Sequence, residues 1–342
     1  MVLVLLIAGG FLLLGYLMGA SRFAQGGLLC VLFGGVLVIQ ATLPDGHGLR
    51  AATGGSLKAW SVIAGVGVIG VFYTLGLRWL KSRARPAIKP AQTGPFSEQE
   101  LERYTRHIVL REIGGAGQQR LKAAKVLVVG AGGLGSPALL YLAAAGVGTI
   151  GVVDDDTVSL SNLQRQVLHS MDRVGMAKVF SAQTGLIAIN PDVDILPFNR
   201  RLTDENAREL FGGFDLVLDG SDNFATRHLV NATCVALDVP LISAAITQWE
   251  GQIGLYHPAS DGPCYACVFP EIPAEGLAPS CAEAGVMGAL PGVVGSMMAV
   301  EAIKHITGAG PTLTGELLVY DALYGESRKL KAQRRTDCLI CG

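Results

Sequence analysis

The stretch from Val126 to Gln166 constrains the fold of this chain most strongly. It begins with the apolar run Val126–Val129, which is too short for a helix and rich in valine, as is typical of a strand buried on both faces of a parallel sheet. An apolar helix is predicted from about Pro137 to Ala145, and a second strand at Thr149–Val153. Between the first strand and the helix stand glycines in the pattern G-x-G-x-x-G, namely Gly130, Gly132 and Gly135, with Gly133 inside the pattern.

The second strand ends in an acidic triplet, Asp154, Asp155 and Asp156. A strand, a glycine turn, a helix and a second strand with an acid at its end form a nucleotide-binding βαβ unit. Glycines let the backbone approach a phosphate, the helix N-terminus favours its negative charge, and the acid binds ribose hydroxyls. Asp154 follows Gly135 at close to the expected offset of about 20 residues, so it is the predicted ribose ligand. Asp156 faces the same edge, and the sequence assigns it no role.

The polar segment after the acids helps to distinguish a dinucleotide site from a triphosphate site. A glycine turn of this pattern most often binds a dinucleotide cofactor, and a nicotinamide enzyme has no evident need for an arginine and an amide beyond the second strand. Asn162, Gln164 and Arg165 follow here in the sequence SLSNLQRQ, and their side chains suit a triphosphate. The chain resembles the HesA/MoeB/ThiF family, the bacterial relatives of ubiquitin-activating enzymes, closely from Gly130 to Arg165 and more broadly over most of residues 97–342.

The resemblance implies ATP-dependent adenylation of a carboxylate, with release of pyrophosphate. The substrate would be the C-terminal glycine of a small ubiquitin-like sulfur-carrier protein that ends in Gly-Gly, of the molybdopterin or the thiamine type. It also implies the main catalytic roles. Arg165 and Lys178 would bind the phosphates, Asn162 would contact the α/β-phosphate region, and Asp222 would hold Mg²⁺. Capping of the following helix is the alternative role for Asp222, and its neighbour Asn223 joins the predicted nucleotide-binding residues. Arg106, in RYTRHIVL, would enter the nucleotide site of the neighbouring subunit, so a homodimer is expected.

The first 80 positions hold most of the apolar excess of a sequence that is 50% hydrophobic and 16% charged. Three uncharged segments, each near the roughly 20 residues that span a bilayer, are predicted transmembrane helices: Val2–Ala20, Gly26–Leu43 and Ala59–Leu77. A signal peptide is the main alternative for the first segment, but that segment lacks a basic n-region. The predicted organisation is a membrane segment at 1–80, a basic, proline-containing linker at 81–96, and an adenylation domain at 97–342.

Flanking charge predicts the orientation of these spans. The densest basic cluster follows the third segment, at Arg78, Lys81, Arg83, Arg85 and Lys89. Because positive residues stay in the cytoplasm, the adenylation domain is expected at the cytoplasmic face of the inner membrane. The loop Pro44–Lys58 would lie outside, although Arg50 and Lys58 weaken that placement. A formal net charge of −1 gives no basic field for nucleic acid.

Strands and helices alternate through the rest of the chain. Ser97 and Glu100 form a capping box that begins a helix predicted to reach about Arg111. Further strands are predicted at 193–198, 214–218, 240–245, 251–256, 315–320 and 326–331, and helices at 203–211, 227–237 and 294–308, with another beginning within 174–179. This pattern predicts an α/β fold, with a Rossmann-like, doubly wound and mostly parallel sheet that turns antiparallel toward its edge.

Two C-x-x-C pairs predict a metal site. Each pair can hold one metal ion, and together Cys264, Cys267, Cys338 and Cys341 complete a closed tetrahedral site for structural Zn²⁺. Cys281 stands apart in the sequence CAEAGV, and in thiamine-type relatives a cysteine in this context bonds covalently to the activated partner. No sulfurtransferase domain follows the second pair, so a separate sulfur donor is expected.

Two other functions remain open from the sequence. A nicotinamide-dependent oxidoreductase would use the same glycine turn, but it gives no part to SNLQRQ, Lys178 or the cysteine pairs. A membrane-tethered scaffold that binds carrier proteins without activity is the other alternative. Against loss of activity stands the intact set of site residues, which are Arg106, Asn162, Arg165, Lys178 and Asp222.

Overall fold

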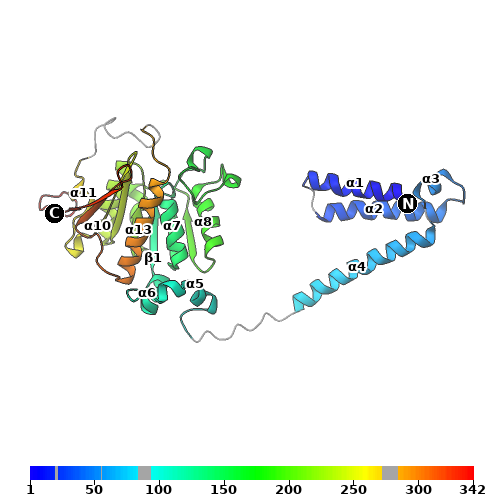
Figure 1. Cartoon of the computed structure of the whole chain (residues 1–342), viewed down its shortest axis with the longest axis horizontal. Helices are drawn as coiled ribbons and strands as arrows, with labels where there is room; N and C mark the ends of the chain where they lie inside the picture. The colour runs from blue at the N-terminus through cyan, green and yellow to red at the C-terminus, as the bar shows by residue number, and fades with distance from the viewer. Residues whose placement is uncertain (20–21, 55, 84–93, 272–283) are drawn as a thin grey trace. The chain divides into compact units, whose positions relative to one another are not determined.

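The computed structural model describes residues 1–19, 22–54, 56–83, 94–271 and 284–342. The chain divides into two compact units, Met1–Ala91 and Gln92–Gly342 (Figure 1). The linker residues 84–93 and the candidate Cys281 lie outside the described residues.

The first unit is helical. Its helices are α1 (Val2–Leu17), α2 (Arg22–Thr42), α3 (Gly48–Thr53) and α4 (Leu57–Arg83). Within the described ranges, two of its segments are long and apolar enough to cross a membrane, Ala24–Thr42 and Leu57–Leu77. They correspond to the second and third predicted spans, whereas α1 has 16 residues and is shorter than such a segment.

Few side chains of this unit are buried, and they form a small internal contact. Val4, Val36 and Trp60 pack together from three different helices. The indole N–H of Trp60 donates to the Gly54 carbonyl at 2.8 Å, and the buried amide of Gln40 donates to the Thr53 hydroxyl at 2.8 Å. These bonds fix the turn that contains α3 against α2 and α4.

The second unit is built on one sheet of eight strands in the order β3-β2-β1-β4-β5-β6-β7-β8. The first five in this order pair in parallel, and β6, β7 and β8 continue the sheet antiparallel. The strands are β1 (Lys125–Val129), β2 (Thr149–Val153), β3 (Asp194–Phe198), β4 (Leu216–Asp219), β5 (Leu241–Ile246), β6 (Glu250–Tyr256), β7 (Glu316–Asp321) and β8 (Glu326–Lys331). The predicted Rossmann-like sheet with an antiparallel extension is confirmed.

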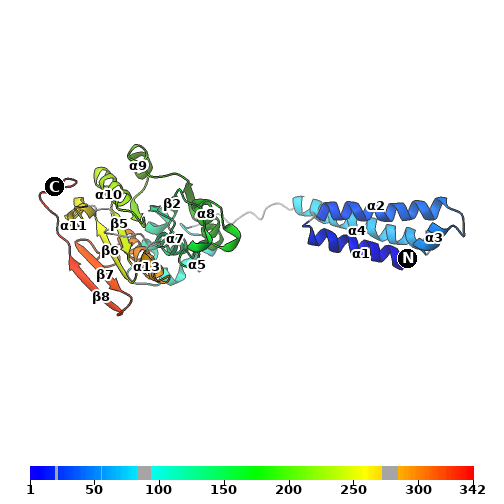
Figure 2. The same cartoon turned by 90° about the horizontal axis from the view of Figure 1, so that it is seen from above.

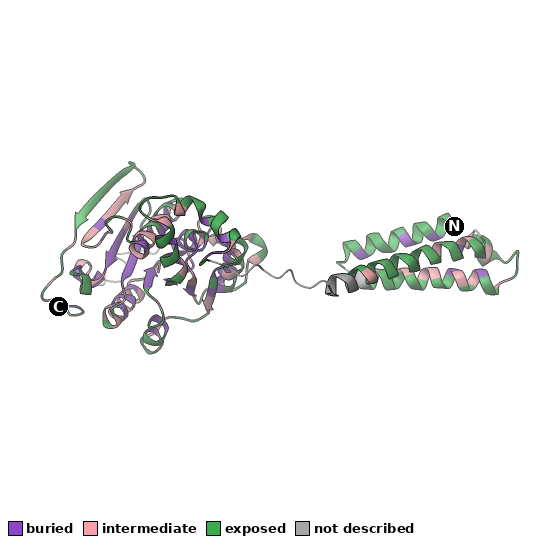
Figure 3. Ribbon diagram, turned by 90° about the horizontal axis from the view of Figure 1, so that it is seen from below, coloured by how far each residue is buried: buried purple, intermediate pink, exposed green. Residues whose placement is uncertain are grey.

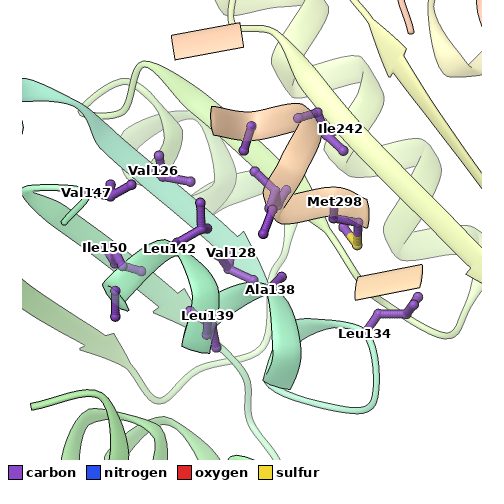
Figure 4. Packing of buried hydrophobic residues seen from close by; sticks show 14 of the residues in the cluster. Val126, Val128, Leu134, Ala138, Leu139, Leu142, Val147, Ile150, Ile242 and Met298 are labelled. Carbon is purple, nitrogen blue, oxygen red and sulfur yellow. The ribbon is translucent and has the colours of Figure 1, made fainter. Parts of the chain in front are cut away.

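Helices cover both faces of this sheet, as Figure 2 shows. They are α5 (Glu98–Ile108), α6 (Gly114–Ala123), α7 (Gly135–Ala145), α8 (Lys178–Ile189), α9 (Asp204–Phe211), α10 (Phe224–Leu237), α11 (Tyr265–Val268) and α13 (Leu290–Thr307). Side chains of β1 alternate between two cores. Val126 and Val128 pack with α7 and α13 (Figure 4), whereas Leu127 and Val129 pack with α9 and α10. This two-sided burial explains the unbroken apolar run of β1.

Most of the predicted elements are confirmed to within a few residues. The capping box of α5 is present, because the Ser97 N–H donates to Glu100 and the Glu100 N–H donates to the Ser97 hydroxyl. That helix ends at Ile108, before the predicted Arg111. Helices α3, α6 and α11 were not predicted, since each is short and lacks a long apolar period.

Candidate active site

The glycine turn joins β1 to α7 at the point where the strand order reverses. From β1 the chain continues to β2 and β3 on one side, and β4 lies on the other. Open α/β sheets bind ligands at such a point, outside the carboxyl ends of the strands. Gly130 has φ +92°, and a Cβ on Gly135 would lie 1.8 Å from the Gly130 carbonyl oxygen. Only glycine therefore permits this turn at those two positions.

Asp154, the predicted ribose ligand, ties the end of β2 to the turn. One carboxylate oxygen accepts from the Ala131 N–H at 2.8 Å and the other from the Asp156 N–H at 2.9 Å. Burial raises the pKa of Asp154, and the nearby Lys178 and these backbone N–H groups oppose that rise. Each carboxylate oxygen has a second acceptor position, so a ribose hydroxyl can still bind it.

His169 supports the same residue, Ala131, from the other side, and no sequence pattern pointed to it. Its Nε2 lies 2.9 Å from the Ala131 carbonyl and its Nδ1 lies 2.8 Å from the Ser181 hydroxyl. A carbonyl only accepts, so Nε2 carries the proton and Ser181 donates to Nδ1. Burial lowers the pKa of His169 and keeps the ring neutral. Ala131 is thus held at both its N–H and its carbonyl.

Lys178 begins α8 and is buried, with its ammonium 2.8 Å from the Asp156 carboxylate. The Lys178 N–H also donates to the Asp156 carbonyl at 2.9 Å. Asp156, to which the sequence assigned no role, therefore holds the lysine at the cavity. The pairing needs the fold to bring two segments together, so spacing along the chain could not reveal it.

The segment SLSNLQRQ forms a short turn of helix at Leu160–Asn162 and then brings Arg165 to the cavity. The Arg165 guanidinium donates to the Ser161 carbonyl at 3.2 Å. Asn162 is not among the cavity-lining residues, and its carbonyl accepts from the N–H groups of Arg165 and Gln166 at 3.1 and 2.9 Å. In this structure Asn162 shapes the segment through its backbone.

The loop after β4 forms the opposite wall. Asp219 is buried and accepts from the Ser221 N–H at 2.9 Å and the Ser243 hydroxyl at 3.0 Å. Asp222 is exposed and lines the cavity. Asn223 is the N-cap of α10, because its side chain accepts from the Thr226 N–H at 2.8 Å. The capping role considered for Asp222 therefore belongs to Asn223, and Asp222 lines the cavity.

One cavity of about 1190 Å³ gathers most of the predicted site. Arg165, Lys178 and Asp154 line it on the side of β1 and β2, and Asp222 lines it on the side of β4. Its walls also hold residues that the sequence analysis missed, among them Gln166, Arg200, Arg201, Arg227 and Tyr265. A volume of this size accepts a nucleoside triphosphate together with the end of a peptide.

Arg106 lies at the other edge of the sheet. It is exposed in the last turn of α5, whose Tyr104 accepts a hydrogen bond from Asn190 at 2.9 Å. Asn190 precedes β3, so α5 sits where the strands begin, whereas the cavity lies where they end. Arg106 is not among the residues that line the cavity of its own chain.

The four paired cysteines meet as predicted. The Sγ atoms of Cys264 and Cys267 are 3.8 Å apart, those of Cys264 and Cys338 are 3.6 Å apart, and those of Cys267 and Cys341 are 3.5 Å apart. A tetrahedral Zn²⁺ with bonds of about 2.3 Å to sulfur needs sulfur–sulfur distances of about 3.8 Å. The cluster therefore fits Zn²⁺, and it joins the C-terminus to the segment that begins α11.

The fold and this cavity define a nucleotide-binding α/β domain with a four-cysteine cluster. The chain belongs to the ThiF family, which matches residues 104–340. It is 51% identical over 251 residues to the sulfur carrier protein adenylyltransferase of Thermus thermophilus, covering 72% of this chain and 93% of that protein. It is 48% identical over 243 residues to the SAMP-activating enzyme E1 of Haloferax volcanii, covering 71% of this chain and 89% of that protein. The fold is also similar to the crystal structure of E. coli MccB with AMPCPP and MccA, with a TM-score of 0.62, 25% identity, and coverage of 70% of this chain and 74% of MccB.

Proposed function

We propose that this protein is a nucleotidyltransferase that uses ATP to adenylate a small ubiquitin-like sulfur-carrier protein at the carboxylate of its C-terminal Gly-Gly. The observation that carries this proposal is the gathering of Asp154, Arg165, Lys178 and Asp222 around one glycine turn. The Thermus relative that shares 51% of aligned residues is named for this activity. The nicotinamide alternative is not favoured, since it leaves Arg165 and Lys178 without a role.

The reaction requires the cavity to bring a carboxylate to the α-phosphorus of ATP. The ionised carboxylate attacks phosphorus, the bond to pyrophosphate breaks, and an acyl-adenylate forms. No general base is needed, because a C-terminal carboxyl group is already deprotonated at neutral pH. The chain contributes position and charge: Arg165 and Lys178 face the phosphates, while Asp154 holds the ribose.

Mg²⁺ fits the wall formed by Asp222. Magnesium in phosphate sites is held by one or two carboxylates, with waters and phosphates completing the shell. The Asp222 carboxylate is exposed at the cavity. Mg²⁺ bound there would neutralise charge on the phosphates. Zn²⁺, by contrast, is proposed as a structural ion in the cluster of Cys264, Cys267, Cys338 and Cys341.

A homodimer would complete the site. Arg106 lies at the edge of the sheet away from the cavity of its own chain, so it serves a nucleotide only in a partner. Exposed apolar side chains support the dimer: Tyr141 and Val167 are 56% and 61% exposed. Tyr141 and Val167 border an apolar groove between α7 and the start of α13. Exposed apolar patches of this kind mark protein interfaces.

The first unit is proposed to anchor the enzyme in the inner membrane, with the second unit in the cytoplasm. Its exposed apolar helices suit a lipid environment. Arg50, which weakened the expected orientation, pairs with Asp45 at 3.0 Å. That ion pair reduces the net positive charge of the outer loop, in keeping with the positive-inside rule.

ATP–pyrophosphate exchange tests the function directly. The purified protein should exchange label between pyrophosphate and ATP only when a carrier ending in Gly-Gly is present. The same carrier lacking its last glycine is the control. Binding of the carrier without exchange would establish the inactive scaffold, and binding of NADH without ATP would establish the oxidoreductase.

A further inference from the structure

Arg227 is a buried arginine on the cavity wall that the proposed reaction has not used. It stands in the second turn of α10, is 7% exposed, and lines the cavity. One guanidinium nitrogen donates to the Ser221 carbonyl at 2.6 Å. Among the residues that the structure describes, Arg227 forms no ion pair. Asp219, the buried carboxylate of the same wall, is held by Ser221 and Ser243 instead.

A buried cation without an ion pair is costly unless a ligand supplies the negative charge. A guanidinium has five N–H donors; the Ser221 carbonyl accepts from one of them and the Tyr265 hydroxyl lies within hydrogen-bonding reach of the group, which leaves donors for a ligand. The Ser221 hydroxyl is also buried without a hydrogen-bond partner in the described part of the chain. The N-terminus of α10 adds its own positive end at the same wall, where Phe224 and Thr226 line the cavity.

The surroundings of Arg227 distinguish it from the phosphate-facing cations. Lys178 and Arg165 stand with the glycine turn, at the ends of β1 and β2. Arg227 lies beside Tyr265 of α11. Burial raises the pKa of Tyr265, and the adjacent guanidinium opposes that rise. The cavity is also lined by Phe269, which follows α11, and by Gln248, which lies between β5 and β6.

We propose that Arg227, with the Ser221 hydroxyl beside it, binds the terminal carboxylate of the carrier and orients it toward the α-phosphorus of ATP. This inference rests on the proposed function. One carboxylate oxygen accepts from the guanidinium while the other attacks phosphorus. In the product, the acyl carbonyl oxygen stays at Arg227, and the negative charge leaves with pyrophosphate. Arg227 touches the reacting group and is in this sense a catalytic residue.

The test compares two synthetic peptides of about ten residues that end in Gly-Gly, one with a free carboxylate and one with a carboxamide. Their affinities for the full-length protein are measured in the presence of α,β-methylene ATP and Mg²⁺. A charge-assisted hydrogen bond corresponds to roughly tenfold to a hundredfold in affinity. The wild type should therefore prefer the carboxylate by about tenfold or more, and Arg227→Gln should reduce this preference to about twofold or less. Affinity for the carboxamide and for α,β-methylene ATP should stay unchanged.

Arg208→Gln is the matched control, since Arg208 is an exposed arginine on α9 that does not line the cavity. Arg227→Lys keeps the charge but loses the planar fork, and it should retain an intermediate preference even if the glutamine variant does not fold. An equal loss of affinity for both peptides would show that Arg227 only supports the loop, and a loss of affinity for the nucleotide would show that it binds phosphate. Either result would overturn the inference. An unchanged preference in Arg227→Gln would overturn it too, with the adenylation proposal left standing. A wild type that binds neither the nucleotide nor the peptides would instead remove the proposed function.

Discussion

The two units of this chain place their apolar side chains in opposite ways. In the second unit Val126, Leu127 and Val128 are fully buried in the sheet, and Figure 3 shows the strands of its centre as buried. In the first unit Ile69 and Phe72 are 69% and 71% exposed, and its helices are mostly exposed in the same figure. The residue types are similar, so the difference indicates different surroundings. One unit has the buried core of a domain that folds in water, and the other is proposed to face lipid.

This comparison agrees with the proposal that one unit carries out the chemistry and the other anchors it. Every residue proposed to contact ATP, the carrier or a metal lies after Gln92. In the first unit, polar side chains such as Gln40 and Trp60 form their hydrogen bonds with the turn of the same unit. Four experiments test whether the units are as independent as this division says.

The largest effect is expected from the site that two chains would share. Arg165→Ala and Arg106→Ala should each lower carrier-dependent pyrophosphate exchange by about 100-fold or more, because each removes a cation from the phosphates. When the two variants are mixed and allowed to exchange subunits, about a quarter of wild-type activity should return, since half of the dimers are mixed and each has one intact site. A mixture that stays inactive would show that Arg106 does not act across the dimer.

The cysteine cluster should give the next largest effect, and only on the second unit. Cys338→Ser should lower the metal content from about one Zn²⁺ per chain to near zero, because one of four ligands is lost. Unfolding of the second unit should begin roughly 5 °C lower or more, since binding free energy of a structural metal is folding free energy. Elemental analysis and calorimetry measure the two changes. Cys30→Ser, in α2, is the control and should keep both metal and stability; a metal-free wild type would remove the zinc assignment.

The sequence predicted the frame of the second unit well because its signals are local. The strand boundaries of β2 and β8 and the capping box of α5 follow from alternation, length and cap chemistry over a few residues. The glycine turn was predictable for the same reason, since Gly130 and Gly135 meet a steric need within one loop. The four cysteines were predictable because metal-ligand pairs have a fixed spacing.

The rest of the site depends on contacts that only the fold creates. Asp156 is paired with Lys178, His169 supports Ala131, and Arg227 lies beside Ser221, and none of these pairs has a characteristic spacing. The cap of α10 was considered for Asp222, but its neighbour Asn223 is an equally good N-cap residue and holds that position. The first predicted span was overlong because hydropathy does not mark where α1 ends at Leu17. Tertiary pairing, rather than pattern, decides such positions.

Removal of residues 1–80 should have a large effect on location and a small one on chemistry. The shortened protein should leave the membrane fraction, while its exchange rate with a saturating carrier changes by about twofold or less, within the range expected for distant, independent sites. Sedimentation with membranes and the exchange assay provide the two measurements. The shortened Arg165→Ala variant is the inactive control. Loss of exchange in a shortened chain that still unfolds cooperatively would show that the first unit takes part in the reaction.

The smallest effect concerns the beginning of the second unit, where Glu100 is buried and forms an ion pair with Lys122 at 2.6 Å. Although burial raises the pKa of Glu100, hydrogen bonds from Lys122 and Ser97 hold it below its ordinary value of 4.5. A carboxyl group with a lowered pKa in the folded state stabilises the protein above pH 4.5, and this contribution is lost as the pH falls through the folded pKa. Glu100→Gln should therefore cost about 1 kcal/mol at pH 7, and the difference from wild type should shrink below pH 4.5 in thermal unfolding. Glu102→Gln, at an exposed position of the same helix, should change stability little at either pH. If Glu100→Gln lowered the free energy of unfolding by the same amount in acid, the packing of this side chain rather than its charge would stabilise the helix. The first helix of the second unit would then not depend on that ion pair.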